Sequence, residues 1–152
     1  MKLNILYEDN HLLVLEKPRN MPVQADSSKD LDLLNAAKDF LKMKYNKPGE
    51  AFLGLVHRLD RPVGGVILFA KTSKAASRIS NEIRLNRFER QYLAVVRGLP
   101  KKSKGRLTDY LLKDTSKNMS EVVNAKVKNA KKAILDYEIL EVNHEENVSL
   151  LS

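Results

Sequence analysis

The segment of residues 57–70, with the sequence HRLDRPVGGVILFA, constrains the fold of this chain most strongly. One carboxylate, Asp60, stands between two arginines, a pair of glycines follows, and the segment ends in an apolar run over residues 66–70. Guanidinium groups hold a neighbouring carboxylate ionised and fixed in direction. Glycines permit a sharp turn or the close approach of a ligand, and the short apolar run predicts a buried strand. We therefore expect a reactive carboxylate on a tight turn that a rigid strand supports.

The rest of the chain predicts short strands and two helices. Apolar runs at residues 3–7 and 12–16 predict a strand pair. Asp30 is the expected N-cap of a helix over residues 31–45, and a second amphipathic helix is expected over residues 73–85. Further strands are expected near residues 52–56, 65–70, 89–97, 106–112, 133–141 and 147–151.

This order of elements predicts an α+β fold. We expect a mixed, mostly antiparallel sheet with helices packed against it, in one domain over residues 1–152. The polar, lysine-rich stretch of residues 113–132 predicts a long hairpin or loop.

The composition is that of a globular chain, with 43% apolar residues and a length sufficient for a core. There is no cysteine, which excludes a disulfide framework and a thiolate metal site. His11, His57 and His144 are scattered, so no metal site is expected and His57 is predicted to be structural. The start of the chain lacks the apolar core of a signal peptide, and no run is long enough to span a bilayer. We therefore expect a cytoplasmic protein with no membrane partner.

The net charge of +8 is unevenly distributed. Residues 71–106 hold eleven Lys and Arg side chains and only two carboxylates. Such a cluster attracts phosphate backbones and releases counterions on binding, although a solvated surface is the commoner explanation. Because the cluster follows directly after the predicted reactive turn, we favour RNA as the partner.

The segment around Asp60 resembles the signature of the RluA-type RNA pseudouridine synthases. That signature is His-Arg-Leu-Asp, Arg, any residue, Thr-Ser-Gly, a hydrophobic strand and Ala-Lys-Thr. The matching positions run in order, without a gap, from His57 to Thr72. The chain departs from the family at Val63 and Gly64, where Thr and Ser are usual, and it therefore lacks two hydroxyls there.

The resemblance extends on both sides of this motif. Residues 7–18 resemble the family's opening strand pair with its Lys-Pro, and residues 90–98 resemble its Lys-x-Tyr-x-Ala strand, with Arg90 in place of the lysine. The family's final motif, Thr-Gly-Arg followed by His-Gln-Ile-Arg, does not occur before the last residue, Ser152. We therefore expect residues 1–152 to be a catalytic domain truncated at its C-terminus, without a separate N-terminal RNA-binding domain.

The resemblance implies isomerisation of specific uridines to pseudouridine in structured ribosomal or transfer RNA, without a cofactor because no redox change occurs. It implies that Asp60 is the catalytic carboxylate, which attacks the sugar covalently or removes a sugar proton. It implies that Arg58 and Arg61 bind phosphate or fill the gap left by a flipped base, and that Tyr92 stacks on the uracil. Basic side chains expected along the RNA backbone are Lys17, Lys71, Arg78, Arg84 and Arg90.

Other functions fit parts of the sequence. Without the motif, an aspartate between arginines would be a structural ion pair, and Tyr92 would be a core aromatic residue. A non-catalytic RNA-binding module of the same fold is the main alternative, because the family arginine that pairs with the carboxylate belongs to the absent motif. A carboxylate-dependent hydrolase would need a second acidic residue near Asp60, which the local sequence lacks. The kinase His-Arg-Asp motif has no residue between its Arg and Asp, so we exclude that class.

Overall fold

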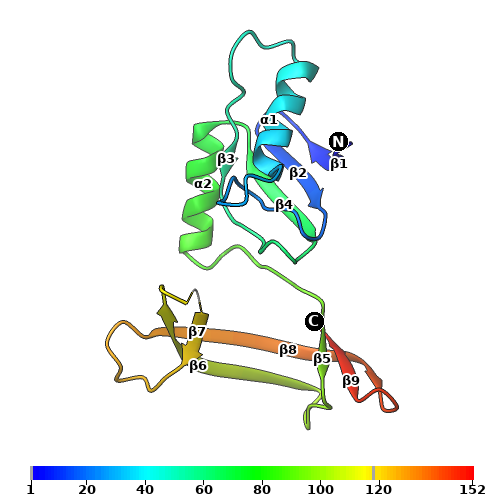
Figure 1. Cartoon of the computed structure of the whole chain (residues 1–152), viewed down its shortest axis with the longest axis vertical. Coiled ribbons are helices and arrows are strands. Elements are labelled where there is room, and N and C mark those ends of the chain that lie inside the picture. The colour runs from blue at the N-terminus through cyan, green and yellow to red at the C-terminus, as the bar shows by residue number, and fades with distance from the viewer. Residues whose placement is uncertain (1, 118) are drawn as a thin grey trace. The chain divides into compact units, whose positions relative to one another are not determined.

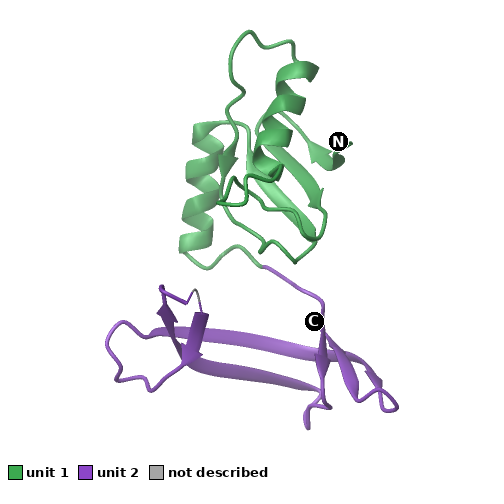
Figure 2. Cartoon of the chain, in the orientation of Figure 1, with its two compact units in different colours: residues 1–89 green, residues 90–152 purple. Residues whose placement is uncertain are grey.

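The chain forms two compact units, residues 1–89 and residues 90–152 (Figure 2). The computed structural model describes residues 2–117 and 119–152, and each unit is built on its own antiparallel sheet. The α+β class is as predicted, although the strands form two sheets and not the single sheet expected. That residues 1–152 act as one catalytic domain stays a prediction.

The first unit contains a four-stranded sheet of order β1-β2-β4-β3 (Figure 1). β2 and β4 are antiparallel neighbours, with Leu12 opposite Ala70 and Lys17 opposite Gly65. The strand pair predicted near the start of the chain and the strand predicted over 65–70 are thus confirmed. The strands of this sheet are β1 (Asn4–Glu8), β2 (Leu12–Lys17), β3 (Gly54–Leu55) and β4 (Gly65–Ala70).

Helix α1 (Leu33–Lys44) covers this sheet and completes the core. Its side chains at i, i+4 and i+8 are buried, as expected for one face of a helix. Leu13 and Leu15 of β2, and Ile67 and Phe69 of β4, are buried at alternate positions, so one face of the sheet meets the helix. Within the described ranges, the buried apolar side chains all lie between Leu13 and Ala70.

The start of α1 corrects one prediction. Its N-cap is Asp32, whose Oδ1 accepts a hydrogen bond from the backbone N–H of Asn35 at 2.9 Å. Asp30, the predicted cap, instead binds the guanidinium group of Arg61. Both aspartates are chemically competent caps, and the tertiary partner decides between them.

Helix α2 (Ser73–Arg84) packs along β3 and β4 with its apolar side only half-buried. Thr72 caps it by accepting a hydrogen bond from the N–H of Ala75 at 3.2 Å. None of its residues is fully buried, and most of its polar side chains are exposed. Neither of the helices in the described ranges is long and apolar enough to cross a membrane.

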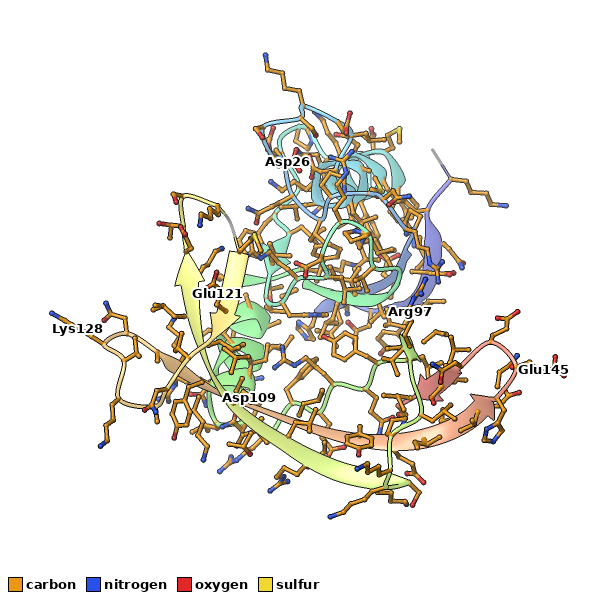
Figure 3. The ribbon with its side chains drawn as sticks, turned by 60° about the horizontal axis from the view of Figure 1, so that its bottom comes forward. Asp26, Arg97, Asp109, Glu121, Lys128 and Glu145 are labelled. Atoms are coloured by element: carbon orange, nitrogen blue, oxygen red, sulfur yellow. The ribbon has the colours of Figure 1, made fainter. Side chains whose placement is uncertain are left out.

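The second unit is a five-stranded antiparallel sheet of order β5-β9-β8-β6-β7. β7 lies inside the stretch 113–132, which the sequence predicted as a hairpin or loop, and its side chains are exposed. Charged side chains such as Lys128 and Glu145 lie at the turns and point outward (Figure 3). The strands are β5 (Ala94–Arg97), β6 (Lys104–Asp114), β7 (Met119–Val122), β8 (Lys131–Asn143) and β9 (Val148–Leu151).

Candidate active site around Asp60

Asp60 lies on a tight turn in the loop between β3 and β4. Its carbonyl oxygen accepts a hydrogen bond from the N–H of Val63 at 3.0 Å. The preceding side chain, Leu59, is buried in the core, whereas Asp60 is exposed. The backbone of the turn is therefore held while the Asp60 carboxylate remains accessible.

Gly64 and Gly65, the two glycines after the turn, are constrained in different ways. Gly65 has φ +138°, a conformation that side chains with a Cβ rarely adopt, and it starts β4 directly after the loop. At Gly64 a Cβ would lie 3.3 Å from the carbonyl oxygen of Lys17 and 3.1 Å from Cγ of Arg19. A serine at position 64, usual in the family, would therefore require Arg19 to shift.

Lys17 holds the turn from the end of β2. Its ammonium donates hydrogen bonds to the carbonyl oxygens of Met21 at 2.7 Å, Pro18 at 3.0 Å and Arg61 at 3.1 Å. Asn20, with φ 62°, lies in the turn that brings the first two of these carbonyls together. Lys17 therefore joins β2 to the residue that follows Asp60.

The position of Lys17 corrects its predicted contact with the RNA backbone. The residue is 1% exposed, and its ammonium is occupied by carbonyl oxygens. Burial lowers the pKa of Lys17, while the negative charge of Asp60 opposes that shift. The sequence contained a signal for this burial, because Lys17 follows Leu13 and Leu15 on the same face of a strand.

The partners of Arg61 are also not the expected ones, because the sequence predicted that two guanidinium groups hold Asp60. It binds Asp30, lies 3.7 Å from Asp26, and donates to the hydroxyl of Ser28 at 3.0 Å. The hydrogen bond from Arg61 lowers the pKa of Asp30. In the described part of the chain Asp60 forms no ion pair with either neighbouring arginine.

Lys71 is the second correction among the predicted RNA contacts. Its side chain is 12% exposed, and its ammonium binds Glu8 at 2.7 Å and the carbonyl oxygen of Asp9 at 2.6 Å. Burial alone would lower the pKa of Lys71, but the hydrogen bond to Glu8 raises it. Lys71 therefore joins the end of β4 to β1 and is not a free surface cation.

The exposed cations Lys74 and Arg78 lie one turn apart on α2 and line a groove of about 500 Å³. Neither forms an ion pair within residues 2–117 and 119–152. Arg84, at the end of the helix, is also exposed and binds the side chain of Asn81 at 2.8 Å. The groove lining is completed by Asp9, His11, Leu12, Thr72, Ala75 and Ile79.

Tyr92 and Arg90 belong to the second unit, in the segment that precedes β5. The side chain of Tyr92 is 48% exposed, so it is not the core aromatic of the structural alternative. Arg90 is exposed as well. Among the described residues, no group of His, Cys, Asp and Glu side chains is arranged to hold a metal ion.

The class of protein follows from a comparison of the chain with known families. The family model described as RNA pseudouridylate synthase matches residues 11–152. The chain therefore belongs to the RNA pseudouridylate synthase family, as its motifs predicted.

Curated relatives of this chain carry the name ribosomal large subunit pseudouridine synthase C, and two of them show the extent of the similarity. The chain is 37% identical over 115 residues to that of Buchnera aphidicola subsp. Schizaphis graminum (strain Sg), covering 76% of this chain and 35% of the relative. It is 38% identical over 94 residues to that of Escherichia coli (strain K12), covering 62% of this chain and 28% of the relative. The chain thus spans about a third of the length of the curated relatives that it matches.

Solved human structures confirm the fold. The chain superposes with a TM-score of 0.79 on human RNA pseudouridylate synthase domain containing 4, at 23% identity, covering 97% of this chain and 57% of that chain. For human RNA pseudouridylate synthase domain containing 1, the TM-score is 0.73 at 21% identity, covering 99% of this chain and 58% of that chain.

Proposed function

We propose that the protein isomerises specific uridines to pseudouridine in structured RNA, with Asp60 as the catalytic residue. The observation that carries this proposal is the exposed Asp60 carboxylate on a turn whose backbone is fixed by Leu59, Lys17 and Val63. Membership of the RNA pseudouridylate synthase family supports it.

The reaction needs no redox partner. The bond between ribose C1′ and uracil N1 breaks, the base rotates, and a bond from C1′ to C5 forms. The proton on C5 is lost and N1 gains one, so atoms and electrons balance. Two roles fit Asp60: attack on the sugar to form a covalent intermediate, or removal of a sugar proton.

Two further side chains complete the proposal. Arg58 is exposed and lies two residues before Asp60, so we assign it to phosphate or to the space left by the flipped base. Arg61 would have to leave Asp30 and Ser28 to act in this way, and we do not include it. Tyr92 would stack on the uracil ring and assist loss of the C5 proton.

RNA is the proposed partner, and ribosomal large-subunit RNA is the proposed substrate because the curated relatives carry that name. The unpaired cations of α2 support an interaction with phosphates. Action in the cytoplasm is part of the same proposal.

The test is tritium release from large-subunit RNA that contains uridine labelled at C5. Asp60→Asn keeps the shape of the side chain but removes the charge and the nucleophile, so turnover should fall by at least about 100-fold. RNA binding, followed by fluorescence anisotropy, should change by less than about threefold because the RNA-contacting cations are untouched.

Asp39→Asn is the matched control, because Asp39 is an exposed aspartate of α1 remote in sequence from the turn. It should behave as the unmodified protein. Turnover of Asp60→Asn within about tenfold of the unmodified protein would remove Asp60 from the mechanism. Tight RNA binding without turnover by the unmodified protein would support the non-catalytic alternative.

A further inference from the structure

His57 lies just beyond the point where β3 ends and the loop to Asp60 begins. β3 pairs with β4 through Gly54 opposite Ala70 and Leu55 opposite Phe69. Leu68 is the next residue of β4 along this ladder. The N–H of Leu68 donates a hydrogen bond to Nε2 of the His57 imidazole at 3.0 Å. Because β3 ends at Leu55, this N–H is bound by a side chain and not by the backbone of a paired strand.

This hydrogen bond places a chemical requirement on residue 57. The side chain must present an acceptor at the distance of Nε2, and that nitrogen must carry no proton. The imidazole also lies 5.8 Å from the ring of Phe88, tilted by 48°, which limits its rotation. A residue without an acceptor would leave the N–H of Leu68 without this partner in a half-buried strand.

The hydrogen bond from Leu68 to His57 attaches both ends of the Asp60 loop to the same strand, β4. One end of the loop is the first residue of β4, Gly65, and the other end is His57, bound to the middle of the same strand. Between them Leu59 is buried in the core. With both ends fixed on β4, the backbone of Asp60 has few conformations open to it.

We propose that His57 is a positioning residue for the isomerisation, which fixes the Asp60 turn on β4 through the N–H of Leu68. It contacts no substrate and supplies no proton. The inference rests on the proposed function, because it gives His57 a role in catalysis only if Asp60 is the catalytic residue.

Two variants separate the acceptor from the ring. His57→Gln presents an oxygen near the place of Nε2, and His57→Phe keeps an aromatic ring without an acceptor. His144→Phe is the matched control, since His144 is exposed in the turn between β8 and β9.

Amide hydrogen exchange at Leu68 tests the contact without reference to activity. Exchange should be slow in the unmodified protein, in His57→Gln and in His144→Phe, and at least about tenfold faster in His57→Phe. Equal protection in His57→Phe would show that the imidazole does not hold the strand, and would overturn the inference.

Steady-state turnover of the labelled RNA tests the consequence. His57→Phe should lower kcat by about 10–100-fold while KM changes by less than about threefold, because misplacement of Asp60 affects the reaction and not the RNA contacts. His57→Gln should recover kcat to within about threefold. A rise in KM alone, or equal losses of kcat in both variants, would contradict the positioning role.

The two proposals fail in different ways. If Asp60→Asn stays active, the proposed function fails, and the catalytic role of His57 falls with it, whatever the exchange at Leu68 shows. If Asp60→Asn is inactive and His57→Phe is fully active, only the inference about His57 fails.

Discussion

At the scale of single residues, the surroundings of Asp60 show how a buried cation can organise a loop. The Lys17 ammonium has carbonyl oxygens as its hydrogen-bond partners, and one of them belongs to Arg61, directly after Asp60. A buried charge is costly unless its hydrogen-bonding capacity is used. Here the donors meet acceptors from two segments that are distant in the sequence, so Lys17 stabilises the approach of β2 to the Asp60 turn.

Lys17→Met should therefore destabilise the protein. The change keeps an unbranched side chain but leaves the carbonyl oxygens of Met21 and Arg61 without this donor, which should lower the free energy of unfolding by about 2–4 kcal/mol. Urea unfolding followed by circular dichroism measures the loss. Lys42→Met, at an exposed position of α1, is the control and should change stability by less than about 0.5 kcal/mol. A similar small change for Lys17→Met would show that the carbonyls find other donors.

At the scale of elements, one carboxylate joins three parts of the first unit. Glu8, at the end of β1, accepts hydrogen bonds from Lys44 and Tyr45 at the end of α1 and from Lys71 after β4, at 2.7, 2.6 and 2.7 Å. Burial alone would raise the pKa of Glu8, but these three donors lower it from 4.5 to about 2. The carboxylate thus fixes the helix and the two strands to one another.

The stability of the first unit should depend on pH through Glu8. Because its pKa in the folded state is lower than in the unfolded state, its contribution is complete above about pH 4.5 and is lost as the pH falls toward about 2. Glu8→Gln should cost about 2–3 kcal/mol at pH 7, and the difference from the unmodified protein should shrink at pH 3. Urea unfolding at the two pH values measures this.

Glu50→Gln, at an exposed position after α1, is the control for this experiment and should cause no comparable loss at either pH. A cost of Glu8→Gln that stays the same between pH 7 and pH 3 would show that the stabilisation comes from packing and not from the charge.

At the scale of the whole molecule, the positive charge divides into paired and unpaired cations. Lys44, Lys71 and Arg61 are held by carboxylates within the first unit, whereas Lys74 and Arg78 have no ion pair in the described part of the chain. Unpaired cations attract phosphates and exchange their counterions for them. We therefore expect the net charge of +8 to act on RNA through the exposed part of α2 more than through the residues beside Asp60.

RNA affinity should fall steeply with salt, and the variant Lys74→Ala/Arg78→Ala should flatten that dependence. Each lost phosphate contact reduces the slope of log affinity against log salt by about 0.7–0.9, so the double variant should reduce it by about 1–2. Fluorescence anisotropy over a salt series with large-subunit RNA measures the slope.

The variant Lys42→Ala/Lys47→Ala is the control, because it removes the same charge from exposed positions at and beyond the end of α1. It should leave the slope close to that of the unmodified protein. Equal flattening in both variants would show that the net charge acts at long range and that the groove beside α2 makes no local contact.

The sequence alone determined the local structure and the family. The period of two in β2 and β4 and the amphipathic pattern of α1 are local properties, and the predicted elements were found where the patterns placed them. The motif around Asp60 gave the family because its residues are consecutive. β7 was predicted only as part of a hairpin or loop over residues 113–132, because a polar, exposed strand has no apolar alternation that would give its bounds.

Only the tertiary structure decided what each charged residue does. The alternation along β2 indicates that Lys17 is buried but not which groups it binds, and its partners come from the loops after β2 and around Asp60. Lys71 resembles any other lysine in the sequence, yet its partner is a carboxylate of β1. Arg61 stands next to Asp60 but binds Asp30, which lies far back in the chain. Hydrogen bonds and ion pairs act over a few ångströms in space and not along the sequence, so their partners become known only when the strands and loops are assembled.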